Sequence, residues 1–202
     1  MDKGKIKEKF GNYFIADENT YKMGIDFRFA DHLASRFKDL VVLETCSGGG
    51  FSSISLARYA RHVYSFEIDK SRILDAKKNA EIAGVGSKIN FINMDIYKIN
   101  RAKIIHRFDA AFIDPDWTDT DTGHEYRFIN STTQPPSDDL LAMVLKIVPN
   151  ITLIQPPYVN VNEFVGLPVH ELEYLYQVDS LELYCLHFGS LAKKKGRSEY
   201  RI

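Results

Sequence analysis

The chain has 202 residues, of which 45% are hydrophobic and 26% charged, with a formal net charge of −1. This length allows one domain with a proper core, and the balanced charge excludes a global basic field that would attract polyanions. Only two cysteines occur, Cys46 and Cys185, without metal-ligand spacing, which indicates a reducing, cytoplasmic environment rather than a disulfide framework. The sequence shows no apolar signal segment and no run long enough to cross a membrane.

Both ends of the chain are rich in basic residues, which lie at Lys3, Lys5, Lys7 and Lys9 and at Lys193, Lys194, Lys195, Arg197 and Arg201. We expect solvated, frayed ends, with an RNA-binding patch as the alternative. The predicted organisation is an N-terminal basic segment with a leading helix over 1–39, a core over 40–190 and a basic tail over 191–202.

Helices and strands alternate along the core. A helix predicted over 26–37 leads into the first of five apolar strands, which cover 40–45, 62–68, 88–95, 108–114 and 150–155. Helices are predicted between them over 52–60, 70–84 and 137–148, the last with Ser137 as its N-cap. Two period-two segments, 169–178 and 181–188, predict an antiparallel hairpin. We therefore expect an α/β fold, a Rossmann-like, seven-stranded and mostly parallel sheet with helices on both faces.

Four consecutive predicted strands end in an acid, namely Glu44, Glu67, Asp95 and Asp114. Ligands of open parallel sheets bind beyond these carboxyl ends, and carboxylates are costly in a core. Gly48, Gly49 and Gly50 follow the first strand, where glycines let the backbone approach a ligand. The Lys-Ser/Thr pair of a phosphate-binding loop and the last glycine of a dinucleotide fingerprint are both missing.

These positions describe an adenosine pocket. Glu67 is spaced to accept both ribose hydroxyls, although it could instead pair on the surface with Lys70 or Arg72. Asp95 could accept the adenine amino group while Ile96 packs on the ring, although Asp95 alone would suit a helix cap.

The combination resembles the class I S-adenosylmethionine-dependent methyltransferases. "VLETCSGGG" is similar to their glycine motif, with Glu44, Gly48 and Gly50 in matching places and Cys46 where a glycine is usual. "YSFEID" and "NMDIY" are similar to the second and third motifs. The resemblance implies S-adenosyl-L-methionine as cofactor, bound by Glu44, Cys46, Gly48, Gly50, Glu67, Asp95 and Ile96.

The stretch "DPDW", residues 114–117, resembles the tetrapeptide with which such enzymes methylate a nitrogen conjugated to a planar ring. In this interpretation the Asp114 side chain and a main-chain carbonyl accept the amine N–H bonds, Pro115 offers no competing N–H, and Trp117 stacks on the base. Asp114 as a helix cap and Trp117 as a core residue are the structural alternatives.

The segments "KINFINMDIY", "FDAAFIDPDW" and those that follow to residue 189 resemble trimethylguanosine synthase and its relatives, the RNA cap guanine-N2 methyltransferases. The chain departs from this family's Ser-Pro-Pro-Trp motif at Asp114 and Asp116, and "TDT" at 118–120 replaces glycines. Asp116 could contact the base or be a solvated loop acid. "QPPY" at 155–158 is either a wall of the acceptor cleft or a plain loop, and Tyr174, Tyr176 and Tyr184 favour sheet packing.

No metal site is expected, because the histidines lack ligand spacing and the acids of 116–125 do not match a calcium loop. The expected function is methylation of a nucleobase nitrogen, with guanine N2 of RNA as target and RNA as partner. The alternatives are methylation of a small planar molecule or a protein, adenine-N6 methylation, or a non-catalytic module that binds the cofactor. The oligomeric state is not indicated by the sequence.

Overall fold

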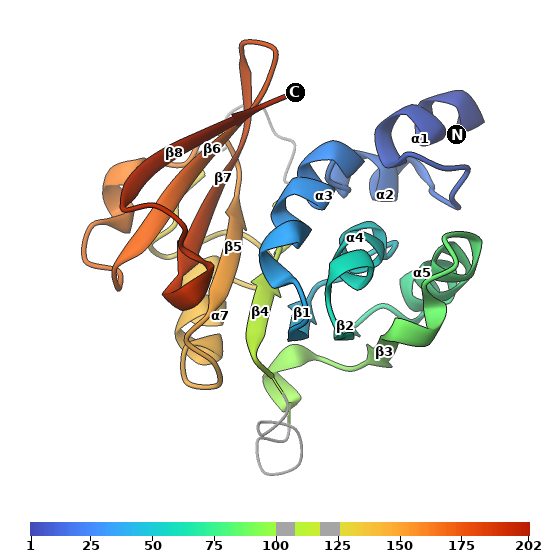
Figure 1. The fold of residues 1–202 in the computed structure, drawn as a ribbon, viewed down its shortest axis with the longest axis horizontal. Helices are drawn as coiled ribbons and strands as arrows, with labels where there is room; N and C mark the ends of the chain where they lie inside the picture. The colour runs from blue at the N-terminus through green and yellow to red at the C-terminus, as the bar shows by residue number, and fades with distance from the viewer. Residues whose placement is uncertain (100–107, 118–125) are drawn as a thin grey trace. The chain divides into compact units, whose positions relative to one another are not determined.

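The structure is a computed structural model that describes residues 1–99, 108–117 and 126–202 (Figure 1). It divides into two compact units, residues 1–110 and 111–202. The sequence features at 118–125, including "TDT" and the acids compared with a calcium loop, lie outside the described residues.

The first unit is built around three parallel strands, β1 (Val41–Thr45), β2 (His62–Glu67) and β3 (Ile89–Asn93), in the order β3-β2-β1. The helices α1 (Lys3–Phe10), α2 (Glu18–Met23) and α3 (Phe27–Ala34) and the short helix η1 (Ser35–Phe37) precede the strands. The helices α4 (Phe51–Tyr59) and α5 (Lys70–Ile82) connect them and pack against the sheet, and η2 (Gly86–Lys88) and η3 (Ile96–Lys98) flank β3 (Figure 1). Such crossovers bring the carboxyl ends of β1, β2 and β3 to one edge.

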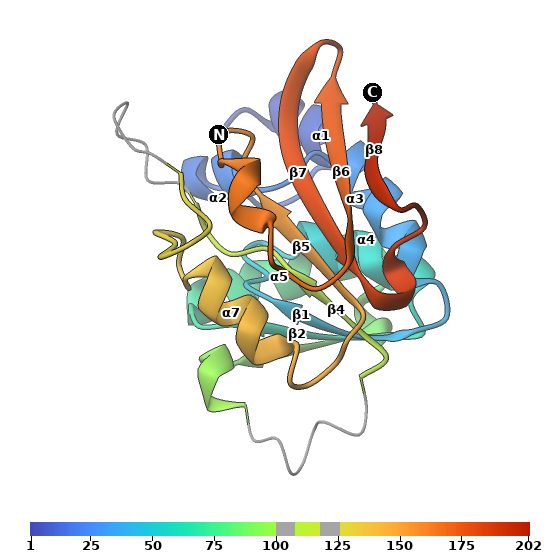
Figure 2. The same cartoon turned by 90° about the vertical axis from the view of Figure 1, so that its left-hand side faces the viewer.

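The second unit contains β4 (Ala110–Ile113) from its second residue onward, β5 (Ile151–Gln155), β6 (His170–Gln177), β7 (Ser180–Phe188) and β8 (Gly196–Arg201), in the order β4-β5-β7-β6-β8. β4 and β5 are parallel, β5, β7 and β6 are antiparallel neighbours, and β8 runs parallel to β6. The helix α7 (Ser137–Val144) runs beside β5 in both views (Figures 1 and 2). The short helices η5 (Val161–Phe164) and η6 (Gly189–Leu191) flank the hairpin.

The core strands are buried as their composition predicts. Every residue of β4 and β5 is buried, whereas β6 alternates between buried and partly exposed residues as a strand with one solvated face does. The α/β class, the mostly parallel strand pairing and the antiparallel hairpin of β6 and β7 are confirmed.

The two basic ends differ from the expectation of frayed tails. At the N-terminus, Asp2 caps α1 by accepting from the Gly4 N–H, and Ile6 and Phe10 bury one face of the helix. At the C-terminus, residues 196–201 form β8, an eighth strand in addition to the seven expected. Backbone pairing and a few buried side chains therefore order both ends.

The expected N-cap of α7 is also different. Pro136 occupies the cap position, and Ser137 is the first residue of the helix. The Ser137 hydroxyl instead accepts a hydrogen bond from Gln155 Nε2 at 2.9 Å, which joins the start of α7 to the end of β5.

Candidate functional site

The glycine turn after β1 requires unusual backbone conformations. Cys46, Gly48 and Gly50 have positive φ angles of 59°, 50° and 81°. A Cβ at Gly50 would lie 2.9 Å from the Cβ of Ala76, so this glycine is needed for both conformation and space. A Cβ at Gly48 would meet nothing within 4 Å, which leaves room beside the loop. Cys46 adopts a conformation that favours glycine, which explains why glycine is usual at this place in similar motifs.

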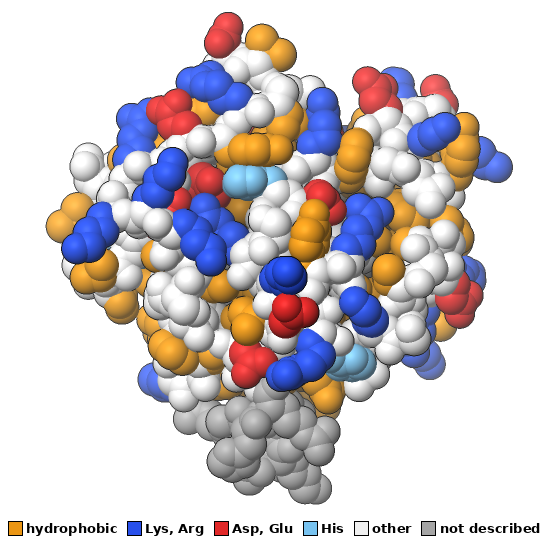
Figure 3. Space-filling view, in the orientation of Figure 1, with side chains coloured by type: hydrophobic (Ala, Val, Ile, Leu, Met, Phe, Trp, Pro, Cys, Tyr) orange, Lys and Arg blue, Asp and Glu red, His pale blue; other side chains and the backbone are white. Residues whose placement is uncertain are grey.

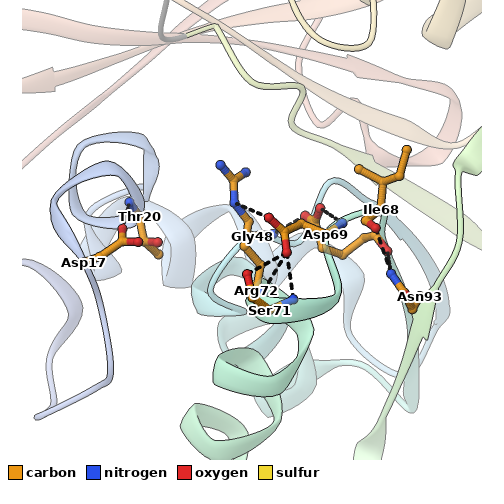
Figure 4. Close-up of polar contacts among 9 residues, drawn as sticks. Asp17, Thr20, Gly48, Ile68, Asp69, Ser71, Arg72 and Asn93 are labelled. Atoms are coloured by element: carbon orange, nitrogen blue, oxygen red, sulfur yellow. Dashed lines mark hydrogen bonds and ion pairs between the residues drawn. The ribbon is translucent and has the colours of Figure 1, made fainter.

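Glu67 holds the glycine turn and the end of β2 together. Its carboxylate is only 5% exposed. The Gly48 N–H donates to Oε2 at 2.8 Å, and the Asp69 N–H donates to Oε1 at 2.9 Å (Figure 4). This burial contradicts the alternative of a surface carboxylate, and the carboxylate that lies 4.0 Å from the Arg72 Nε is that of Asp69.

Glu44 lies fully buried at the carboxyl end of β1. The Ser53 hydroxyl donates to its Oε2, and the Ser65 hydroxyl lies 3.1 Å from that of Ser53. Burial raises the pKa of Glu44 to about 7, against the lowering effect of the two serines, and the charge of Glu67 raises it further. The site therefore contains one carboxyl group that can take up a proton near neutral pH.

Three buried polar oxygens near the turn have no hydrogen-bond partner within the described parts of the chain. They are Glu44 Oε1, Thr45 Oγ1 and Ser47 Oγ. Because buried polar atoms are rarely unsatisfied, three of them in four consecutive residues indicate a polar ligand or ordered water at this position.

The end of β3 is joined to the end of β2. Asn93 Nδ2 donates to the main-chain oxygens of Glu67 and Ile68, at 3.0 and 2.8 Å (Figure 4). Asp95 follows two residues later and caps η3 by accepting from the Tyr97 N–H at 3.0 Å, as the structural alternative predicts. Ile96 is buried beside it. Glu44, Cys46, Gly48, Gly50, Glu67, Asp95 and Ile96 all belong to the first unit, at the carboxyl ends of β1, β2 and β3.

The segment before β1 also reaches the glycine turn. Asn79 of α5, which is fully buried, donates from Nδ2 to the Ile15 and Gly49 carbonyls, both at 3.0 Å, and accepts from the Ile15 N–H at 2.7 Å. The Phe51 ring stacks on Phe10, with ring centroids 3.7 Å apart. Asn79 therefore fixes the turn and the preceding segment at once.

Asp17 lies in the same segment and carries a negative charge beside these contacts. The Thr20 backbone N–H and then the Thr20 hydroxyl hold the pKa of Asp17 below its usual value, and the Arg72 charge adds to this (Figure 4).

Sequence reasoning missed Asn79, although a signal was present. Asn79 lies three residues after Ala76, on the α5 face whose small and apolar residues predicted burial. A polar side chain on a buried face needs partners, which was the available clue.

The Asp-Pro-Asp-Trp stretch follows β4 in the second unit. Asp114 is partly exposed and Pro115 is buried. Trp117 is partly exposed, and its indole makes an edge-to-face contact with Tyr126, with ring centroids 6.5 Å apart. Tyr158, from the "QPPY" stretch, is 78% exposed and lies nearly parallel to Tyr126 at 6.0 Å. Three aromatic rings therefore line this end of β4 and β5.

A backbone bridge positions the acidic tetrapeptide. The Asp116 N–H donates to the Gln134 carbonyl at 3.0 Å, and the Gln134 N–H donates back at 2.7 Å. The bridge thus uses the Asp116 carbonyl as an acceptor. The neighbouring residue Thr133 is linked to the end of β5 by hydrogen bonds. Its hydroxyl lies 2.8 Å from that of Ser137, which accepts from Gln155 Nε2.

Over residues 1–99, 108–117 and 126–202, no three His, Cys, Asp or Glu side chains are grouped so as to hold a metal ion. In the same part of the chain, no helix combines the length and hydropathy of a membrane span.

Comparison with known families gives one match that covers most of the chain. Residues 40–185 match the RNA cap guanine-N2 methyltransferase family. A curated relative, Ribosomal RNA small subunit methyltransferase A of Wigglesworthia glossinidia brevipalpis, is 29% identical over 108 residues. This alignment covers 54% of the present chain and 36% of the relative, so the chain spans little more than a third of that protein.

Solved structures share the fold at low sequence identity. A putative methyltransferase from Porphyromonas gingivalis W83 has a TM-score of 0.67 and 14% identity, and the match covers 87% of the present chain and 43% of the other. TrmK of M. capricolum, solved with S-adenosyl-homocysteine, has a TM-score of 0.55 and 13% identity, with 83% and 69% covered. These likenesses confirm the Rossmann-like α/β class.

Proposed function

Because the chain belongs to the RNA cap guanine-N2 methyltransferase family, we propose that it transfers methyl groups from S-adenosyl-L-methionine to a nucleobase nitrogen of RNA, with guanine N2 as the target. The chain is a class I methyltransferase, and S-adenosyl-L-methionine is its cofactor.

The residues of the first unit fit this cofactor. The unpartnered oxygens of Glu44, Thr45 and Ser47 suit the amino and carboxyl groups of a methionine moiety. Glu67 suits the ribose hydroxyls, and the open space beside Gly48 lets a ligand approach the backbone. Asp95 and Ile96 would contact the adenine.

The second unit supplies the groups that suit a planar amine. When bound, the cofactor provides an electrophilic methyl group. The Asp114 side chain and the Pro115 carbonyl would accept hydrogen bonds from the two N–H groups of the exocyclic amine. These hydrogen bonds would restore lone-pair character to its nitrogen. Trp117 would stack on the base, an interaction worth about 1–3 kcal/mol. This orientation of the nitrogen would supply a large part of the rate acceleration.

The observation that carries the proposal is the partly exposed Trp117 at the end of β4, in a chain of this family. The likeness to a protein named for ribosomal RNA supports a second candidate, methylation of another base nitrogen in structured RNA. The cytoplasmic location expected from the number and wide spacing of the cysteines remains part of the proposal.

The test is incubation of the purified protein with labelled S-adenosyl-L-methionine and total cellular RNA, followed by nucleoside analysis. N2-methylguanosine is the expected product. Labelled N6-methyladenosine would contradict guanine N2 as the target and support the second candidate. Cofactor binding without any labelled nucleoside would contradict both candidates.

Trp117 offers a matched variant for this test. Trp117→Ala should abolish transfer while the Kd for S-adenosyl-homocysteine stays unchanged, and Trp117→Phe should retain part of the activity because phenylalanine still stacks. An equal loss of cofactor affinity in Trp117→Ala would contradict the assigned role.

A further inference from the structure

The turn that leads into β8 is organised by a buried acid. Glu171 of β6 is 1% exposed. Its carboxylate accepts from the backbone N–H groups of Lys193 and Lys194, at 2.6 and 3.1 Å, and from the Ser198 hydroxyl at 2.5 Å. The backbone of this turn is therefore fixed from inside, while the lysine side chains stay exposed.

The outward face of β6 and β8 carries arginines stacked on tyrosines. The Arg197 guanidinium carbon lies 4.0 Å from the centre of the Tyr174 ring, and that of Arg201 lies 4.1 Å from the Tyr176 ring. The two rings are nearly parallel, with an interplanar angle of 12°. Such stacking holds the planar guanidinium groups in one orientation, which lowers the entropy lost when they bind a ligand.

Positive charge predominates on this surface, which we call the β8 face. It is formed by Tyr174, Tyr176, Lys193, Lys194, Lys195, Arg197, Glu199 and Arg201. Figure 3 shows Lys and Arg side chains gathered over the part of the view occupied by β6 and β8, with acidic side chains among them. Two carboxylates pair with these arginines: Glu199 pairs with both, and Asp179 lies 3.9 Å from Arg201 Nη1.

Glu199 lies between the two arginines. Arg197 donates to one of its carboxylate oxygens at 2.6 Å, and Arg201 donates to the other at 3.1 Å. It aligns the guanidinium groups but also offsets part of their charge.

We propose that the β8 face binds the single-stranded RNA that flanks the methylated base, a proposal that rests on the proposed function. Cations that follow one strand attract a phosphate backbone, and planar groups beside them allow bases to stack. Proteins that bind single-stranded RNA combine these two features. The competing interpretation is that the charges only protect an edge strand from pairing with other chains.

The experiment measures binding of a fluorescently labelled single-stranded RNA oligonucleotide over a range of salt concentrations, without methyl donor. The double variant Arg197→Gln, Arg201→Gln should bind about tenfold or more weakly. The slope of log K against log salt should become shallower by about 1.4, because each phosphate contact on a single strand contributes about 0.7. The double variant Arg197→Lys, Arg201→Lys should keep the slope.

Glu199→Gln provides the opposite test, because it removes a negative charge and keeps an acceptor for the arginines. RNA should bind this variant more tightly than the wild type. An edge-protecting role predicts no change in either direction, so unchanged affinity and slope in both variants would overturn the proposal.

This outcome is distinguishable from failure of the proposed function. RNA binding that depends on the β8 face, without formation of methylated guanine, would contradict only the proposed function. Formation of methylated guanine, with an RNA affinity that the arginine variants do not change, would contradict only RNA binding by the β8 face. If circular dichroism shows that the double glutamine variant is unfolded, the RNA affinities of Glu199→Gln and of the double lysine variant test the proposal instead.

Discussion

Glu44 combines full burial with an acidic group, and this has a measurable consequence for stability. The difference between the ordinary pKa of 4.5 and the folded value of about 7 corresponds to roughly 3 kcal/mol. Because the folded pKa is the higher one, this contribution to stability is complete below about pH 4.5 and is lost as the pH rises through about 7.

Glu44→Gln should remove this pH dependence, since glutamine does not ionise. The free energy of unfolding, measured with urea at several pH values between 4.5 and about 8, should fall with rising pH for the wild type relative to the variant. Parallel curves for the two proteins would contradict a raised pKa at Glu44.

Glu67→Gln tests the carboxylate that joins the glycine turn to the end of β2. Glutamine keeps one acceptor but directs an NH₂ group at one of the two backbone N–H donors, those of Gly48 and Asp69. We expect glutamine also to lose a charged hydrogen bond to the ribose hydroxyls, worth about 1.5–3 kcal/mol, so the Kd for S-adenosyl-homocysteine should rise by about ten- to a hundredfold. Calorimetry measures this change, and the exposed Glu81→Gln should leave the Kd unchanged.

Single residues were predictable from the sequence where their type restricts their environment. The turn glycines and the acids at the strand ends are such residues. The hydrogen bonds of Asn79 were not, because its partners Ile15 and Gly49 are distant in sequence.

Among the elements, α5 links the segment before β1 to the turn after it. Asn79→Ala would leave the Ile15 N–H and the Ile15 and Gly49 carbonyls without this partner, at about 1–3 kcal/mol for each group that stays buried. We expect a lower Tm and a weaker affinity for S-adenosyl-homocysteine. Lys78→Ala, on the exposed face of the same helix, is the control. A lower Tm with unchanged affinity would limit Asn79 to a role in stability.

The elements of the core followed from hydrophobic pattern, and their observed ends lie close to the predicted ones. The strand β8 did not follow, because its inward residues are Ser198 and Tyr200 and its burial depends on the acid at Glu171. A strand held by polar contacts carries no apolar periodicity to detect. In α1 the spacing of Ile6 and Phe10 fits one helix face, but the four lysines dominate its composition.

At the scale of the whole molecule, cofactor binding should order a defined set of segments. Hydrogen exchange with saturating S-adenosyl-homocysteine should slow at residues 44–50 and 67–69, and also near Ile15, which Asn79 links to the turn. The β6–β8 region should exchange as before. Protection confined to β6–β8 would place the cofactor elsewhere.

The family and the Rossmann-like class followed from the order of motifs along the chain, whereas the identity of the acceptor did not. Donor-binding residues are recognisable because they occur at the ends of consecutive strands. The acceptor is recognised by a few side chains such as Trp117 and Tyr158, whose contacts depend on loop conformation.

The anchoring of the Lys193–Lys195 turn has one more consequence. Glu171 accepts from backbone N–H groups rather than from ammonium groups, so acetylation of the lysine side chains would remove positive charge without releasing the strand. The charge of this turn can thus be adjusted independently of its shape.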